Sequence, residues 1–432
     1  MITKSNRRTQ LFKIGKKHSG YFITTFIYSA IPLLFLPILT RYLSPSEYGN
    51  IALFRFYMAI SNSLAGVSIP IMISKNFFDQ EKGYISKIIG NSIFVSFSFS
   101  FITMILIILF SNIIMKYINL PLFWLVLIPW VSFFFVIFNI GLTVLRNQKK
   151  VLLFSKHKIG NVITNISISL LLVVILIWGW EGRVWGIILS FFISALFALK
   201  YLKSNGYLTL KFSKNTFKKI LQLVLPLIPN SLQAVITAQI GVFFIQFYYS
   251  KELLGIYSVG FQIAFSIKLL FNTLSMSWSP YLYEKLSKST QINKIQLVRY
   301  FYVIGFILFC GVLFVNLFSD LILRIIATKS YMGANEFIPY FTLGFLFNGL
   351  YIFLQPILVK NEKQKYLSLI SFINMTSLIF LNIIFVKFFG YIGIAYAFAF
   401  SAFAMFLAFF IKTQNVYPLP WFKALIPESI KK

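Results

Sequence analysis

Two cations, Arg55 and Lys268, stand in stretches of sequence that are otherwise uncharged and apolar. A charged side chain at the centre of a membrane helix costs about 2.5–3.5 kcal/mol, so such residues usually face a water-filled cavity or an ion of opposite charge. All ten acidic residues fall in loops, at the ends of apolar stretches or in a tail. Neither cation therefore has a carboxylate partner inside an apolar stretch, and this pattern favours binding of an anionic group.

Polar residues follow both cations at helical spacing, which places them on one face of each helix. The alternative for either cation is that its long side chain snorkels to the nearest interface. Three further cations lie at the ends of apolar stretches and are weaker candidates. The predicted binding residues are Arg55, Lys268, Asn62, Asn272, Ser275, Ser279, Arg41, Lys75 and Arg146.

The composition excludes several classes of protein. Of the 432 residues, 58% are hydrophobic and 12% are charged, whereas a soluble domain has about 25% charged residues. This excludes an ordinary soluble protein and a disordered one. The single cysteine, Cys310, excludes an intrachain disulfide, and the two histidines, His18 and His157, are far apart beside lysines. We expect no metal site and no cofactor.

Twelve apolar stretches are long enough to be candidate membrane helices, which need about 20 residues each. The sequence thus predicts an all-α membrane protein with twelve transmembrane helices. The stretches are 18–40, 56–74, 88–115, 117–145, 159–180, 184–199, 220–250, 253–283, 300–319, 337–359, 366–386 and 388–411. The second helix is expected to begin near Gly49, so that Arg55 lies inside it, and 253–283 is broken only by Lys268.

The basic residues alternate from loop to loop along these stretches. Of the 40 lysines and arginines, 31 fall in the two tails and the even-numbered loops, seven fall in the odd-numbered loops, and Arg55 and Lys268 lie within helices. Cytoplasmic loops carry the excess of basic residues in membrane proteins. We therefore predict a multi-pass membrane protein with both termini cytoplasmic. Because topology explains most of the net charge of +30, no nucleic-acid partner is expected.

The sequence also contains a weak internal repeat. "LSPSEYGNIA" (43–52) resembles "YSKELLGIYS" (249–258) at an offset of 206, and Gly186 and Ser194 match Gly393 and Ser401 at an offset of 207. Six helices per half make the halves parallel repeats. Arg55 then corresponds to a position seven residues before Lys268, and seven residues turn a helix by about 700°, close to two full turns. Both cations are expected on the same face of equivalent helices.

The repeat divides the chain into two predicted six-helix bundles with basic tails. The predicted divisions are a basic N-terminal tail (1–17), an N-terminal bundle (18–205), a cytoplasmic linker (206–219), a C-terminal bundle (220–412) and a C-terminal tail (413–432).

Several segments carry a resemblance to a known family. "LSPSEYG" after the first helix, "LPLIPNSL" in the seventh and "LLGIYSVGFQIA" and "SMSWSPYLYE" in the eighth resemble the O-antigen flippase family. These are polysaccharide-unit transporters of the multidrug/oligosaccharidyl-lipid/polysaccharide exporter superfamily. The resemblance implies two six-helix bundles around a central cavity. It also implies flipping of a polyprenyl-diphosphate-linked oligosaccharide to the outer leaflet. Membrane lipids, a polysaccharide polymerase and a chain-length regulator are the further partners it implies.

Two alternatives differ from this hypothesis in the residues they require. A drug exporter of the same superfamily would use carboxylates within the membrane to hold cationic drugs, and the apolar stretches contain none. A polysaccharide polymerase or glycosyltransferase would need a catalytic acid or base on a sizeable outward loop. The longest such loop, about 320–336, has only Asp320 and Glu336 as carboxyl groups. We therefore expect a transporter and not an enzyme.

Overall fold

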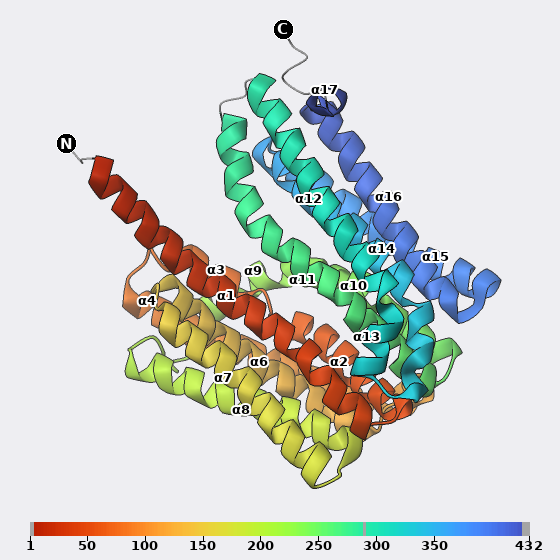
Figure 1. The fold of residues 1–432 in the computed structure, drawn as a ribbon. Coiled ribbons are helices and arrows are strands. Elements are labelled where there is room, and N and C mark those ends of the chain that lie inside the picture. The colour runs from red at the N-terminus through yellow and green to blue at the C-terminus, as the bar shows by residue number, and fades with distance from the viewer. Residues whose placement is uncertain (1–3, 288–290, 426–432) are drawn as a thin grey trace. The chain divides into compact units, whose positions relative to one another are not determined.

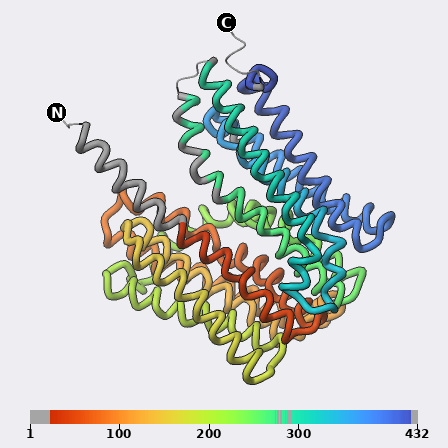
Figure 2. The backbone as a smooth tube through the Cα atoms, in the orientation of Figure 1, coloured from red at the N-terminus to blue at the C-terminus, as the bar shows by residue number. Residues whose placement is uncertain are grey.

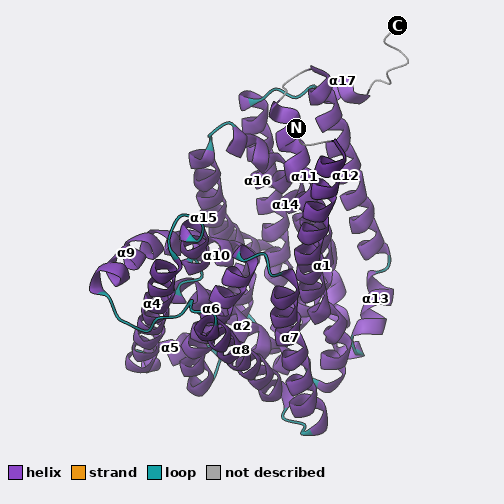
Figure 3. Ribbon diagram, turned by 90° about the vertical axis from the view of Figure 1, so that its left-hand side faces the viewer, coloured by secondary structure: helices purple, strands orange, loops and turns teal. Residues whose placement is uncertain are grey.

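The computed structural model describes residues 4–287 and 291–425, and all of their regular structure is helical (Figures 1 and 3). The predicted all-α class is confirmed. The described chain forms two compact units, residues 1–247 and 248–432, which the colours of Figure 2 follow from red through green to blue.

The first unit contains ten α-helices and two short irregular turns. The turn after α7 is a π-helix, Leu171–Ile175, and a 3₁₀ turn, Leu225–Leu227, joins α9 to α10. The α-helices are α1 (Lys4–Tyr42), α2 (Pro45–Ala65), α3 (Ile69–Asn76), α4 (Lys82–Leu109), α5 (Ser111–Tyr117), α6 (Leu122–Asn147), α7 (Val151–Leu170), α8 (Gly179–Ser204), α9 (Lys214–Val224) and α10 (Ile228–Tyr248).

The second unit begins with the longest helix after α1. Its helices are α11 (Lys251–Ser287), α12 (Gln291–Leu317), α13 (Ser319–Ile326), α14 (Ile338–Lys360), α15 (Gln364–Phe389), α16 (Gly393–Val416) and α17 (Trp421–Leu425), with 3₁₀ turns at Lys329–Glu336 and Gly390–Ile392.

The apolar helices agree with the predicted twelve spans. Ten stretches of the described residues are long and apolar enough to cross a membrane, and α2 with α3, bent by 41°, forms an eleventh. One of the ten, Lys365–Val416, has 52 residues. A helix of that length would extend about 78 Å, against a hydrocarbon core of about 30 Å. Because a turn at Gly390 divides it into α15 and α16, it supplies two spans, which brings the total to twelve.

Equivalent helices of the two halves start at matching positions. Ser44 caps α2: its hydroxyl accepts the Glu47 amide, and the Glu47 carboxylate accepts the Ser44 amide in return. This reciprocal arrangement satisfies amides that a helix start leaves free. At the start of α11 the Ser250 hydroxyl accepts the Leu253 amide at 3.1 Å. The two caps are separated by the offset of 206 that the sequence repeat predicts.

The core of the first unit is largely aliphatic. Residues such as Ile73, Ile89 and Ile140 are fully buried where α3, α4 and α6 meet. The first unit extends to Phe247 and so includes α10. The predicted bundles, divided by a linker at 206–219, remain a prediction.

Candidate functional site

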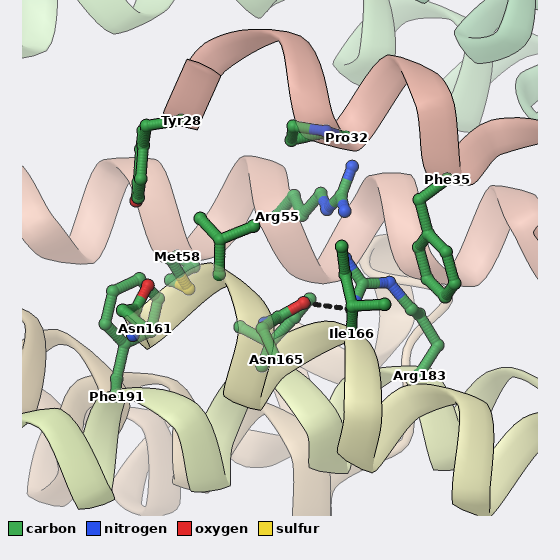
Figure 4. A pocket seen from close by; sticks show the side chains of 12 residues that line it. Tyr28, Pro32, Phe35, Arg55, Met58, Asn161, Asn165, Ile166, Arg183 and Phe191 are labelled. Atoms are coloured by element: carbon green, nitrogen blue, oxygen red, sulfur yellow. Dashed lines mark hydrogen bonds between the residues drawn. The ribbon is translucent and has the colours of Figure 1, made fainter. Parts of the chain in front are cut away.

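A cavity of about 300 Å³ lies within the first unit, among α1, α2, α7 and α8 (Figure 4). Two arginines and two asparagines give it a polar character on one side, and aromatic and aliphatic side chains form the rest. Its lining residues are Tyr28, Pro32, Phe35, Arg55, Met58, Asn161, Val162, Asn165, Ile166, Arg183, Ile187 and Phe191.

Arg183 is the most deeply buried cation of this site, with 4% of its surface exposed. One guanidinium nitrogen donates to the Asn165 carbonyl oxygen at 2.5 Å and to the Ser169 hydroxyl at 2.6 Å. The guanidinium carbon lies 5.3 Å from the centre of the Phe35 ring, a distance at which the ring face attracts a cation. These contacts fix the position of the guanidinium group.

The asparagines of α7 join that helix to α8. The Asn161 amide donates to the Ser194 hydroxyl at 2.9 Å and to the Ser190 carbonyl at 3.1 Å, and the Asn165 amide donates to the Ser190 hydroxyl at 3.0 Å. Their spacing of four residues puts both side chains on one face of α7. The same face therefore presents the Asn165 oxygen to Arg183.

Close packing of α7 and α8 depends on a glycine. A Cβ atom added at Gly186 would collide with the Ser169 hydroxyl and lie 3.1 Å from the backbone carbonyl oxygen of Asn165. Small residues allow membrane helices to approach closely. Gly186 thus brings Asn165 and Ser169 within reach of Arg183.

Arg55 enters the same cavity from α2. Figure 4 shows its guanidinium group and that of Arg183 reaching into the same part of the cavity. The two cations are close enough to interact electrostatically, and both also interact with Tyr48, which is buried nearby. No carboxylate lines this cavity among the residues that the structure describes.

The carboxylate of Glu47 lies at the start of α2 and is engaged elsewhere. Besides capping α2, its other oxygen accepts the Trp180 amide at 3.3 Å. Like-charged neighbours destabilise each other in a low-dielectric site, so the arginine pair favours a bound anion.

Of the predicted binding residues in the first unit, some lie at the cavity and others lie away from it. Arg55 lines the cavity, and Asn62 lies two turns further along the same face of α2, with a buried carbonyl oxygen that has no hydrogen-bond partner among the described residues. Arg41, Lys75 and Arg146 are exposed at helix ends and do not line the cavity.

The predicted candidates of the second unit lie on α11. Lys268 is half-buried, and its ammonium group lies 5.2 Å from the centre of the Phe265 ring. Asn272 is exposed, and its carbonyl oxygen accepts the Ser275 hydroxyl at 2.9 Å. The Ser279 side chain lies outside the described residues.

Three polar residues of the cavity, Arg183, Asn161 and Asn165, were not among the predicted binding residues. Arg183 was one of the seven cations assigned to the odd-numbered loops, and that prediction is wrong: the helix begins four residues earlier, at Gly179, and buries this side chain. The length of an uncharged run underestimates the length of a membrane helix that has a charged residue in its second turn. The signal available was the spacing of Asn161, Asn165 and Ser169, a polar stripe in an otherwise apolar stretch.

Comparisons with known proteins agree with this architecture. The chain is 23% identical over 390 residues to an uncharacterised membrane protein of Haemophilus influenzae, covering 88% of this chain and 93% of that protein. Its fold is similar to that of the lipid II flippase MurJ in an inward closed conformation (TM-score 0.73, 17% identity, 91% of this chain and 87% of that one). It is also similar to an inward-facing multidrug resistance MATE family transporter of the MOP superfamily (TM-score 0.68, 14% identity, 90% and 95%).

A family profile gives the assignment. Residues 14–286, more than half of the chain, match the profile of the polysaccharide biosynthesis protein family. This range covers the first unit from residue 14 onward and all but the last residue of α11, and it includes both Arg55 and Lys268. The chain belongs to the polysaccharide biosynthesis protein family.

Proposed function

We propose that this protein is a flippase that moves a polyprenyl-diphosphate-linked oligosaccharide, such as an O-antigen repeat unit, from the cytoplasmic to the outer leaflet of a bacterial inner membrane. The observation that supports it best is the arginine pair, Arg55 and Arg183, in a cavity without a carboxylate among its lining residues. Family membership and the fold shared with transporters support the same conclusion. A polysaccharide polymerase and a chain-length regulator are its proposed partners.

The chemistry of the carrier matches that of the cations. A diphosphate diester carries two negative charges, and arginine and lysine bind phosphate oxygens through charge-assisted hydrogen bonds. In the proposed cycle the lipid tail stays in the bilayer while the headgroup passes through the protein. Arg55 and Lys268 contact the diphosphate in this proposal, and the polar groups of Asn62, Asn272, Ser275 and Ser279 bind sugar hydroxyls. Arg41, Lys75 and Arg146 are weaker candidates for contact with the headgroup in this proposal, Lys75 and Arg146 at the cytoplasmic ends of their helices and Arg41 at the outer end, a role that suits their exposure.

Two rival functions fit the residues less well. A carrier of cationic drugs would present its substrate to two guanidinium groups, those of Arg55 and the buried Arg183, which repel a cation. An enzyme would need free carboxylates on the outward segment, but Asp320 pairs with Arg324 at 2.9 Å and Glu336 accepts the Tyr391 hydroxyl at 2.8 Å.

Surface polysaccharide in a flippase-deficient strain tests the proposal. We expect Arg55→Ala and Lys268→Ala each to lower it at least ten-fold at normal membrane abundance, because each removes a cation that binds the diphosphate. Lys268→Arg should keep part of the activity, since it keeps the charge. Lys203→Ala, which removes an exposed cation at the end of α8, is the matched control and should leave export unchanged. Full export by the Arg55→Ala/Lys268→Ala double variant would refute the proposal.

A further inference from the structure

Another cavity, of about 220 Å³, lies between α7 and α8, which are neighbours in Figure 1. It shares only Asn161 with the cavity that holds the arginine pair. One wall contains Lys156 and Gly160 of α7, and the other contains Ile193 and Phe197 of α8. Phe197 is 59% exposed, so this cavity is a groove on the surface of the first unit.

Gly160 leaves open the space that the groove occupies. A Cβ atom added at this position would meet no atom within 4 Å, whereas one added at Gly186 would collide with α7. Close packing of the two helices therefore accounts for Gly186 but not for Gly160. The exposed side chains of Ile163 and Leu196 lie next to the groove in sequence. Such apolar surface on two candidate membrane helices is suited to contact with lipid chains.

Two lysines lie at one end of the groove. Lys156 is five residues before Asn161 in α7, and Lys200 is six residues after Ser194 in α8. The Asn161 amide bonds the Ser194 hydroxyl, and the two helices run in opposite directions. Both lysines therefore lie about 7–9 Å along the helices on the same side of that bond. Lys200 follows Ile193 by seven residues, close to two turns, so it projects from the groove-facing side of α8.

These helices offer the two lysines no carboxylate at this end. α7 contains no acidic residue, and Glu181, the single one in α8, lies at the opposite end of that helix. Both lysines are exposed, and neither makes an ion pair within the described part of the chain. His157 also lines the groove, and its Nδ1 atom lies 2.8 Å from the Leu153 carbonyl oxygen. Because a carbonyl only accepts, Nδ1 carries the proton and Nε2 is left for a ligand.

The equivalent helices of the second unit lack this arrangement. The bond between Asn374 of α15 and Ser401 of α16 corresponds to the asparagine–serine bond of the first unit, and both asparagines lie ten residues after the start of their helix. Counted from this bond, Leu369 and Leu407 stand where the first unit has the two lysines, and Ile373 stands where it has the glycine. All three are exposed. At the same depth the first unit thus has two positive charges and an open notch in place of apolar side chains.

We infer that the groove between α7 and α8 binds one anionic phospholipid. Lys156 and Lys200 hold its phosphate group, and one acyl chain lies over Gly160 against the apolar wall. Lysine binds phosphate oxygens through charge-assisted hydrogen bonds, and basic pockets between membrane helices bind anionic headgroups. The charges select an anionic head, and the apolar wall selects a ligand with a chain. This lipid is a resident of the protein surface and not the transported substrate, so the inference does not rest on the proposed function.

Thermal unfolding of the purified full-length protein in a neutral detergent tests the site. Dioleoylphosphatidylglycerol is compared with dioleoylphosphatidylcholine, which has the same chains but no net charge. We expect the anionic lipid to raise the unfolding temperature saturably, with an apparent affinity at least ten-fold higher. The Lys156→Gln/Lys200→Gln variant should lose this preference, and Lys156→Arg/Lys200→Arg should keep it. Lys87→Gln removes an exposed lysine at the same distance from the start of α4, and this matched control should bind as the wild type does.

A second variant and a second ligand test the part of the site that holds the chain. Gly160→Leu fills the notch but keeps both lysines, and it should weaken binding of phosphatidylglycerol at least ten-fold. Glycerol 3-phosphate, a phosphate without chains, should bind at least ten-fold more weakly than the lipid.

Three results would overturn the inference: equal affinities for the two lipids, a preference that survives Lys156→Gln/Lys200→Gln, or glycerol 3-phosphate binding as tightly as the lipid. Both lysines are exposed, so their replacement leaves the fold intact and the double variant decides. The outcome does not depend on export of an oligosaccharide.

Discussion

The two units share a helical scaffold but fill their interiors differently. In the first unit, α7 and α8 are joined by amide and hydroxyl groups around the buried Arg183. In the second unit, aromatic rings pack edge to face between α11, α14 and α16. The ring centres of Tyr257 and Phe341 lie 5.0 Å apart, and those of Phe345 and Phe398 lie 5.3 Å apart. The first interior thus contains a buried arginine held by polar side chains, whereas the second is packed with aromatic rings.

Positions related by the repeat show where the units diverged. Ser194 on α8 and Ser401 on α16 correspond at the offset of 207, and each is buried and hydrogen-bonded to an asparagine of the preceding helix. At the same offset Arg183 corresponds to Gly390, which has a positive φ of 65°. The repeat therefore kept the hydroxyl that joins two helices, while the buried arginine has no counterpart at the equivalent position of the second unit.

The largest expected effect is on the aromatic core of the second unit. Phe341 is fully buried, and Phe341→Ala should lower the free energy of unfolding by about 3 kcal/mol, because it removes a ring that neighbouring rings surround. Phe306→Ala, at a side chain that is 68% exposed, is the control and should change it little. Thermal unfolding in detergent measures both. Equal losses for the two variants would contradict the assignment of this core.

The next effect concerns the close approach of α7 and α8. Gly186→Ala should lower the free energy of unfolding by about 1–3 kcal/mol, because the added methyl group forces the helices apart, and it should weaken diphosphate binding by moving Asn165 away from Arg183. Gly160→Ala on α7 meets nothing within 4 Å and should be neutral or slightly stabilising. If Gly186→Ala bound pyrophosphate as the wild type does, the helix contact would not determine the position of Arg183.

The smallest expected effects are on the stability of variants at the two equivalent serines, Ser194 and Ser401. Ser401→Ala leaves the buried Asn374 oxygen without the hydroxyl that donates to it at 2.8 Å, and should lower the free energy of unfolding by about 1 kcal/mol. Ser194→Ala should lower it by about 0.5 kcal/mol, because the Asn161 amide keeps its bond to the Ser190 carbonyl. Thermal unfolding of both variants compares them. A larger loss for Ser194→Ala would reverse the expected order.

The sequence determined the class of fold and much of its order. Hydrophobic stretches of bilayer length specify membrane helices because backbone polar groups in lipid must be paired within the helix. The sequence repeat also placed Ser44 and Ser250 at equivalent positions, and the caps that these serines form are local interactions. Arg55 was recognisable for a similar reason: a charge within an apolar helix stands out without knowledge of its neighbours.

The tertiary structure alone decided which residues share a site with Arg55. Asn161, Asn165 and Arg183 come from two other helices, and their meeting depends on the close approach at Gly186, which is a property of packing. Arg183 looks like a loop cation in the sequence because it directly precedes the uncharged run 184–199. Its burial comes from Phe35, Asn165 and Ser169, which lie on α1 and α7, and no local pattern encodes contacts of such sequence separation.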